Sequence, residues 1–167
     1  VLTAMAADVT QTVPSLPMLS AAEQQQLRVD FNATQVDFPQ EALIHELFEQ
    51  QVERTPDTIA VVFEEHSLSY KELNHRANCL AHHLIALGVK PDDRIAICAE
   101  RSPEMVVGLL GILKAGAAYL PLDPAYPAER LAYMLSDAAP VALLTQTALL
   151  NTLNSPLPTV VLDDGGA

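Results

Sequence analysis

The stretch Leu109–Leu131 reads LLGILKAGAAYLPLDPAYPAERL and is the least polar and most regularly patterned part of the chain. Its first half is apolar and ends at Gly116, as a buried helix does. Its second half passes through a short apolar segment and a proline-containing turn into a second helix. The side chains in it that could take part in chemistry are two tyrosines, Lys114, Asp123, Glu129 and Arg130. The stretch predicts a helix, strand, turn and helix in succession, and leaves open whether this unit is an active site or the scaffold of one.

Helices and strands alternate on both sides of this stretch. The pattern predicts helices over 69–88, 102–116, 127–137 and 147–153, and strands over 94–99, 117–123, 140–146 and 159–164. The sequence from Ser69 to Glu72 is a capping box, and Pro103 occupies a first helical position. Apolar strands separated by single helices indicate a parallel sheet with right-handed crossovers. We expect an α/β fold with a partial parallel sheet and flanking helices.

A helix and a hairpin precede this alternating part. Apolar residues recur at helical spacing before a proline, at Leu43, Ile44, Leu47, Phe48 and Val52. They predict a helix with one apolar face directed to the core. The β-branched segment 58–65 and the segment 66–69 follow it and predict a β-hairpin.

The first 41 residues have a different character. They are rich in Gln, Thr, Ser and Pro, and Pro14 and Pro17 interrupt any periodic pattern. One short helix is predicted near 20–28, where Ser20 and Glu23 form another capping box. We expect residues 1–41 to be a linker that packs onto another part of the protein, and residues 42–167 to form the α/β part.

Composition narrows the classes of partner. An apolar content of 50% is typical of a globular protein. The formal net charge of -12 argues against nucleic acids and anionic membranes as partners, because both would repel the chain. The longest uncharged apolar run, 105–113, is about half of the roughly 20 residues that a membrane-spanning helix needs.

The cysteines and the first residues of the chain indicate the cellular compartment of the protein. The start of the chain lacks the basic and apolar regions of a signal peptide. Cys79 and Cys98 stand singly within apolar patterns. We therefore expect two free, buried thiols in a cytoplasmic protein.

The motifs of this chain do not assemble a phosphate-binding or nucleophilic site. The joins that lead into helices read HSLSY, AERSPE and DPAYPAE, and none contains the glycine of a phosphate-binding loop. No serine lies in a G-x-S-x-G sequence. Gly108 and Gly111 lie three residues apart in one predicted helix, where close helix packing explains them.

The titratable side chains have structural explanations too. His75, His82 and His83 lie on one predicted helix without the spacing of an H-E-x-x-H zinc site. Asp163 closes the last strand next to another aspartate and two glycines, as in a strand-ending loop. Lys114 lies in the last turn of its helix, where a cation meets the exposed carbonyls favourably. We assign no catalytic, cofactor-binding or metal-binding residue in this chain.

Two stretches resemble core motifs of the adenylation domains of nonribosomal peptide synthetases. The sequence LSYKELNHRANCLAHHLIALGV at 68–89 is similar to their first core motif, Leu-(Thr/Ser)-Tyr-x-Glu-Leu. Residues 113–123 are similar to their second, Leu-Lys-Ala-Gly-x-Ala-Tyr-(Val/Leu)-Pro-Leu-Asp. The matching residues are Leu68, Ser69, Tyr70, Glu72 and Leu73, then Leu113, Lys114, Ala115, Gly116, Ala118, Tyr119, Leu120, Pro121, Leu122 and Asp123. The resemblance covers residues 42–164 continuously.

The resemblance implies the N-terminal portion of the large subdomain of an adenylate-forming enzyme. Residues 1–41 resemble the end of a condensation domain and the linker that joins it to adenylation. Adenylation domains use ATP and Mg²⁺ to make an aminoacyl adenylate and pass the acyl group to the phosphopantetheine of a carrier protein. The implied partners are an amino-acid substrate, the carrier protein and the upstream condensation domain.

In the resembling family the catalytic motifs come later in the chain. They comprise a phosphate loop with a lysine, the amino-acid pocket, an acidic residue for the ribose and a lysine on the mobile C-terminal subdomain. None of these motifs occurs before Ala167. We therefore expect the isolated chain neither to bind ATP nor to adenylate, and the stretch Leu109–Leu131 to be scaffold.

Other functions are compatible with these residues. An acyl- or aryl-CoA ligase shares the fold and loosely shares the motifs, but it would release a CoA thioester. A truncated, non-catalytic chain could act only as an interaction module. A third alternative, a Rossmann-like domain that acts independently of nucleotides, is disfavoured because the glycine loop of that fold is missing.

Overall fold

The computed structural model of the chain describes residues 6, 10, 12, 18–153 and 155–164. The chain divides into two units, Val1–Glu41 and Ala42–Ala167. Pro14 and Pro17, where the sequence predicts breaks in periodicity, lie outside the described residues.

The first unit contains helix α2 (Ala21–Arg28) and a short 3-10 helix, η2 (Asp30–Asn32). The predicted capping box of α2 is confirmed. The Glu23 N–H donates to Ser20 Oγ at 3.2 Å, and the Ser20 N–H donates to Glu23 Oε2 at 2.7 Å. No described residue of this unit up to Glu41 is buried, which agrees with its polar composition.

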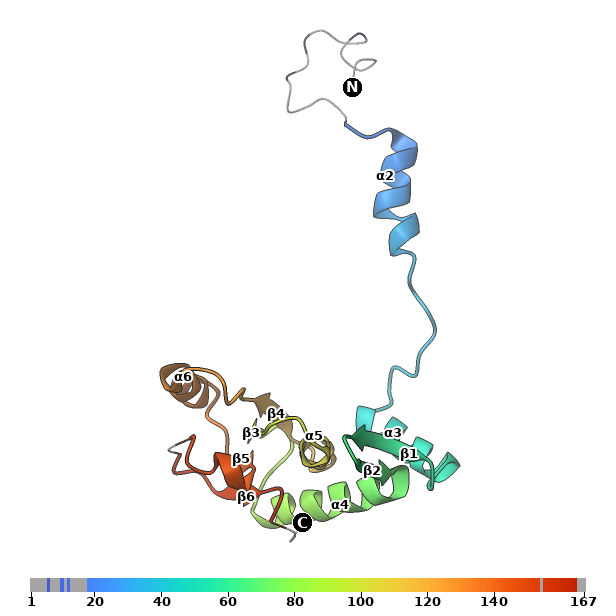
Figure 1. Cartoon of the computed structure of the whole chain (residues 1–167). Coiled ribbons are helices and arrows are strands. Elements are labelled where there is room, and N and C mark those ends of the chain that lie inside the picture. The colour runs from blue at the N-terminus through green and yellow to red at the C-terminus, as the bar shows by residue number, and fades with distance from the viewer. Residues whose placement is uncertain (1–5, 7–9, 11, 13–17, 154, 165–167) are drawn as a thin grey trace. The chain divides into compact units, whose positions relative to one another are not determined.

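The second unit contains the predicted elements in the predicted order (Figure 1). Its helices are α3 (Ile44–Arg54), α4 (Tyr70–Ala86), α5 (Pro103–Lys114), α6 (Ala128–Ala138) and the 3-10 helix η3 (Thr147–Leu149). Its strands are β1 (Ile59–Phe63), β2 (His66–Ser69), β3 (Arg94–Cys98), β4 (Ala118–Pro121), β5 (Ala142–Thr145) and β6 (Thr159–Val161). Strands β1 and β2 form the predicted antiparallel hairpin, and the other four form a parallel sheet in the order β4-β3-β5-β6. The α/β fold is confirmed.

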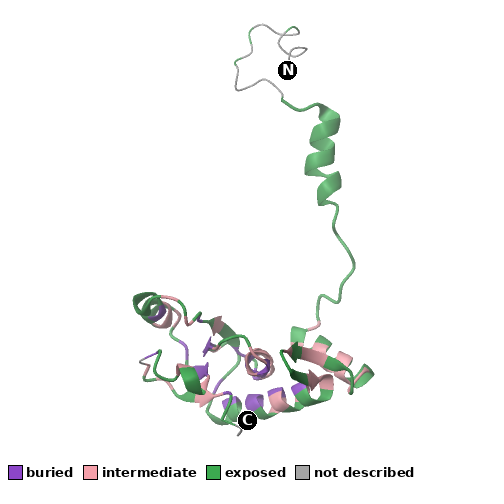
Figure 2. Cartoon of the chain, viewed as in Figure 1, coloured by how far each residue is buried: buried purple, intermediate pink, exposed green. Residues whose placement is uncertain are grey.

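The two faces of the parallel sheet pack against different helices. On one face, Ile95 and Ile97 of β3 and Leu144 of β5 lie in a core with α4 and α5. On the other face, Ala96 of β3 and Leu143 of β5 lie in a core with α6 and the segment between β5 and β6. Figure 2 shows the buried residues gathered in the sheet, in α5 and along the inner side of α4. The sheet is therefore the middle layer of the unit.

The two glycines of α5 permit close packing, as predicted. A Cβ on Gly111 would lie 2.6 Å from Leu80 Cδ2 of α4, and one on Gly108 would lie 2.8 Å from Ile97 Cδ1 of β3. Both distances are shorter than van der Waals contact between carbon atoms. Helix α5 thus approaches α4 through one glycine and the sheet through the other.

Helix α3 buries its apolar face less than its pattern predicts. The side chains of Leu43, Ile44 and Leu47 are 55%, 70% and 40% exposed. Phe48 packs against the core and against the Tyr70 ring, with ring centroids 5.8 Å apart. The expectation of a core-facing stripe is wrong for most of its residues, because the partly buried side of α3 runs through His45, Phe48, Glu49 and Val52 instead.

Strands β4 and β6 stand at the two ends of the strand order, and their burial is incomplete, as Tyr119 at 46% exposure illustrates.

The expectation of two buried thiols is wrong for one of them. Cys79 is exposed, whereas Cys98 is buried, and both thiols are free. Cys79 precedes buried Leu80 on amphipathic α4 and so lies on its outer side. Among the described helices, none is long and apolar enough to cross a membrane.

Candidate functional site

The topology places the candidate site between the carboxyl ends of β3 and β5. The chain leaves β3 for α5, which covers one face of the sheet. It leaves β5 for the segment 146–158, whose leucines pack on the opposite face. These neighbouring strands send their chains to opposite faces, which makes their carboxyl ends a topological switch point, and ligands of open α/β sheets bind in the crevice outside such a point.

The side chain of Gln146, which directly follows β5, bridges this crevice. Gln146 Oε1 accepts a hydrogen bond from the Glu100 N–H at 2.7 Å, and Gln146 Nε2 donates to Ser102 Oγ at 3.1 Å. Ser102 is the N-cap of α5, and its Oγ also accepts from the Met105 N–H at 3.2 Å. The amide of Gln146 therefore connects the end of β5 to the loop that follows β3 and to the start of α5.

Two other polar residues at this edge hold neighbouring strands together. Thr145 is buried, and its Oγ1 donates to the Cys98 carbonyl at 2.9 Å. Asp163 Oδ1 accepts from the Thr147 N–H at 2.7 Å and from Thr147 Oγ1 at 3.0 Å. The backbone hydrogen bond from Thr147, with the weaker one from its hydroxyl, lowers the pKa of Asp163 despite slight desolvation. The carboxyl ends of β3, β5 and β6 are thus joined in sequence by side-chain hydrogen bonds.

A pocket of about 560 Å³ lies beside the crevice, where the chain leaves β3 and β4. One wall contains Ala99, Glu100 and Arg101, and the opposite wall contains residues 121–125. Asp123 shapes the second wall, because its Oδ1 accepts from the Ala125 N–H at 2.9 Å in a local turn. The pocket is mainly apolar with a few charged groups at its rim, which is the usual character of a small-molecule site.

The buried Cys98 thiol is poorly suited to act as a nucleophile at this edge. Burial raises its pKa, and the negative charge of Asp123 raises it further. A thiol with a raised pKa remains protonated at neutral pH, and the thiolate is the reactive form.

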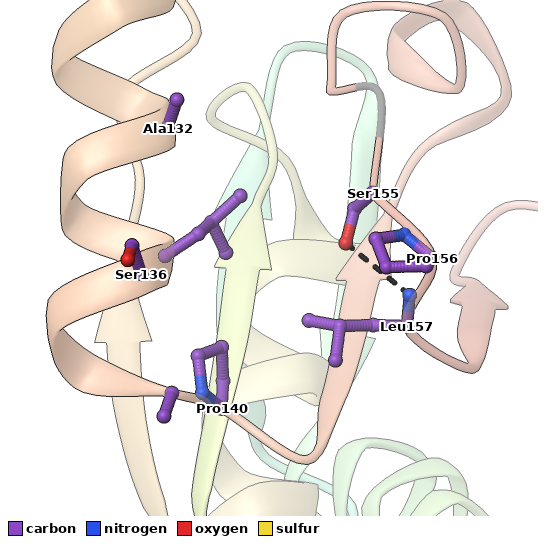
Figure 3. Close-up of a pocket in the computed structure, with 8 residues that line it drawn as sticks. Ala132, Ser136, Pro140, Ser155, Pro156 and Leu157 are labelled. Atoms are coloured by element: carbon purple, nitrogen blue, oxygen red, sulfur yellow. Dashed lines mark hydrogen bonds between the residues drawn. The ribbon is translucent and has the colours of Figure 1, made fainter.

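A second pocket, of about 450 Å³, lies between α6 and residues 155–157 (Figure 3). Ala132 and Ser136 of α6 line one side, and Pro156 and Leu157 line the other. The Ser155 hydroxyl accepts from the Leu157 N–H at 3.3 Å and so is engaged within its own segment. None of the eight lining residues carries an ionisable side chain, so this pocket offers apolar contact without acid–base chemistry.

The structure assigns Lys114 a different partner from the one predicted. Lys114 Nζ pairs with Glu49 Oε1 of α3, and the lysine side chain is 4% exposed. The sequence predicts that this cation meets the exposed carbonyls of its own helix, whereas its observed partner is 65 residues away. This ion pair joins α3 to the last turn of α5, at the end of that helix opposite to Ser102 and the candidate site.

The histidines considered in the sequence do not come together. His75 Nε2 lies 3.9 Å from Cys79 Sγ, one turn apart on α4. His82 lines a polar hollow with His45 and Lys114. Within the described ranges, no three His, Cys, Asp or Glu side chains are grouped so that they could hold a metal ion.

Sequence reasoning missed Gln146 and its role at the site. The pattern predicts one strand over 140–146, but β5 ends at Thr145. A signal was present, since two polar residues, Thr145 and Gln146, close an otherwise apolar strand at its carboxyl end. Polar residues in that position of a parallel sheet face the edge where ligands bind.

Comparisons with known proteins agree with this architecture. Residues 48–166 match the family described as AMP-binding enzyme. The chain belongs to the AMP-binding enzyme family. Malpinin synthetase of Mortierella alpina is 55% identical over 136 residues, which are 81% of this chain and 2% of that protein. Tyrocidine synthase 2 of Brevibacillus parabrevis is 44% identical over 167 residues, which are 100% of this chain and 5% of that protein.

A solved structure of a nonribosomal peptide synthetase is also similar to the chain. It is the nonribosomal peptide synthetase FmoA3 in a form with α-methyl-L-serine-AMP bound, with a TM-score of 0.79 and 33% sequence identity. The match covers 98% of this chain and 19% of that one. The chain thus spans a small part of its relatives, and it corresponds to part of an adenylation domain of the peptide-synthetase kind.

Proposed function

We propose that this chain is part of a domain that activates an amino acid for a nonribosomal peptide synthetase. In the reaction, the carboxylate oxygen of the amino acid attacks the α-phosphorus of ATP, an aminoacyl adenylate forms and pyrophosphate leaves. The acyl group then passes to the phosphopantetheine thiol of a carrier protein and AMP is released. The observation that carries the proposal is the match of residues 48–166 to the AMP-binding enzymes, joined to the likeness to FmoA3.

The contribution of this chain is the scaffold beneath the reaction. The switch point between β3 and β5 and the pocket beside it face the carboxyl edge of the sheet, where a ligand of an open α/β sheet lies. Three polar residues there form hydrogen bonds to neighbouring segments. Gln146 and Thr145 bind the segment that ends β3 and leads into α5, and Asp163 binds the segment that follows β5. They hold the edge in shape and leave proton transfer and phosphate binding to other residues of the domain.

The residues described here do not fit Mg²⁺ or the ATP phosphates. Among them no group of three or more His, Cys, Asp or Glu side chains could hold a metal. The loop after β3 reads AERSP and has no glycine to bring backbone amides close to phosphates. Mg²⁺ and the phosphates of ATP would therefore be held by other residues of the domain.

We further propose that residues 1–41 are the end of a condensation domain and the linker to adenylation. The support is that tyrocidine synthase 2 matches the chain over all 167 residues, so the first unit has a counterpart in that protein. The unit is polar and exposed where described, and Val1–Glu41 forms a unit of its own. The carrier protein and the condensation domain are the proposed partners, and soluble, cytoplasmic synthesis is the proposed setting.

A substrate panel on the complete adenylation domain tests the proposed function. The domain is incubated with ATP, Mg²⁺ and each proteinogenic amino acid, and amino-acid-dependent exchange of pyrophosphate into ATP is measured. We expect exchange with one amino acid or a few similar ones. A parallel reaction with CoA and a panel of carboxylic acids is analysed for thioesters. Formation of a free CoA thioester without amino-acid-dependent exchange would instead identify a CoA ligase.

A further inference from the structure

We propose that Gln146 is a positioning residue of the adenylation reaction: it fixes the loop 99–102, which forms one wall of the carboxyl-edge pocket. This inference rests on the proposed function of the domain. It assigns a role to a side chain that lies outside the two core motifs and that no catalytic step uses.

The hydrogen bonds of Gln146 reach the loop that follows the neighbouring strand β3, and not residues of its own segment. They reach Glu100 and Ser102, which lie 46 and 44 residues earlier in the chain. The carbonyl end of the amide meets a backbone donor, and the amino end meets a hydroxyl oxygen. A side chain with one acceptor and one donor about 2 Å apart suits this pair of partners, and glutamine has both.

The position of the loop decides the shape of the pocket. Ala99, Glu100 and Arg101 line the pocket directly, and Met105 of the first turn of α5 lines it as well. The Met105 N–H is held by Ser102 Oγ, the same oxygen that Gln146 contacts. Gln146 therefore acts on the pocket from behind its wall, and it does not line the pocket itself.

Loss of these bonds should affect the site more than the fold. Gln146 lies at the edge of the sheet, outside both hydrophobic cores. Thr145 continues to bind the Cys98 carbonyl and to hold β5 beside β3. The free loop would then sample other positions, and Glu100 and Arg101 would no longer present a fixed wall.

Three variants of the complete adenylation domain test the proposal. Gln146→Leu removes both hydrogen bonds at similar volume. Gln146→Glu keeps an oxygen that accepts from the Glu100 N–H but loses the donor to Ser102 Oγ, because the Ser102 hydroxyl proton is already given to Glu104. Gln51→Leu is the matched control, because Gln51 donates to Thr55 Oγ1 at 2.7 Å within α3, away from the carboxyl edge. For each variant kcat and KM in pyrophosphate exchange, the Tm and the amide hydrogen exchange of residues 99–105 are measured.

We expect Gln146→Leu to lower kcat/KM about tenfold, the effect of losing one or two hydrogen bonds in an ordered site. The Glu100 amide should exchange at least about tenfold faster, while the Tm stays within a few degrees of that of Gln51→Leu. Gln146→Glu keeps the bond to the Glu100 N–H, so it should recover most of the amide protection and part of the lost kcat/KM. This recovery is the readout that a purely structural role would not produce.

Three results would overturn the proposal. One is a Gln146→Leu domain with kcat/KM within about twofold of the wild type. Another is a Gln146→Leu domain in which kcat/KM falls although the Glu100 amide still exchanges slowly. The third, which applies even if Gln146→Leu does not fold, is a folded Gln146→Glu domain with a protected Glu100 amide and no recovered rate. A wild-type domain without exchange activity for any amino acid contradicts the proposed function instead, and the amide measurement then still decides whether Gln146 holds the loop.

Discussion

Gly111 shows how one residue of α5 sets the distance between two helices. A Cβ at this position would lie 2.6 Å from Leu80 Cδ2 and 3.1 Å from Leu80 Cβ. Because the Leu80 Cβ cannot move without the backbone of α4, we expect Gly111→Ala to destabilise the protein by about 1–2 kcal/mol, overpacking being partly offset by better helix propensity.

Gly108→Ala is the matched comparison for this prediction. Its new methyl would meet Ile97 Cδ1 at 2.8 Å, and the terminal methyl of an isoleucine can rotate away. Urea unfolding should place Gly108→Ala closer to the wild type than Gly111→Ala. An equal or larger loss for Gly108→Ala would show that contact with α4 is not the limiting approach.

Lys114 and Glu49 form an ion pair whose partners differ strongly in exposure. The lysine side chain is 4% exposed and that of the glutamate is 46% exposed. Removing the glutamate leaves a buried ammonium without its anion, whereas removing the lysine leaves a carboxylate that water can solvate. We expect Glu49→Gln to cost roughly 1.5–3 kcal/mol and Lys114→Met to cost less, as measured by denaturant unfolding. The opposite order would mean that the buried amine is satisfied without Glu49.

At the scale of elements, the ion pair of Arg76 and Glu104 links α4 to the first turn of α5 at 3.2 Å. Burial by itself raises the pKa of Glu104, but hydrogen bonds from its own backbone, Arg76 and Ser102 outweigh it and hold the pKa below the ordinary 4.5. A lowered pKa in the folded state means that this contribution to stability is present above pH 4.5 and is lost as pH falls through the folded pKa.

Glu104→Gln should therefore be less stable than the wild type by about 1 kcal/mol at neutral pH. The difference in Tm between the two proteins should shrink as the pH is lowered below 4.5. Thermal unfolding from neutral pH to about pH 3 follows this change. A difference that stays constant over the range would contradict a role for the charge of Glu104.

The sequence was informative about elements wherever local signals agree. Ser69 with Glu72, and Ser102 with Pro103, mark helix starts through side-chain bonds to the first turn, and both helices begin there. The exposure of α3 could not be predicted, because an amphipathic pattern states which side is apolar and not how much of it a neighbour covers. The pairing of β3 with β5 and the hydrogen bonds of Gln146 likewise join residues more than 40 positions apart, and local patterns do not contain such contacts.

At the scale of the whole molecule, we interpret the motif that contains Lys114 as scaffold. It forms the end of α5, β4 and the turn after it, and its lysine pairs with Glu49 of α3. The carboxyl edge of the sheet is preformed by its own side-chain hydrogen bonds. We therefore propose that this chain shapes an adenylation site whose reactive groups come from other parts of the domain.

Pyrophosphate exchange by the isolated 167-residue chain, measured beside the complete adenylation domain, tests this claim most directly. Circular dichroism of the isolated chain first establishes that it holds its helices. We expect amino-acid-dependent exchange by the complete domain and none by the folded chain alone. Exchange catalysed by the isolated chain would contradict it, because catalytic groups would then have to lie among these residues.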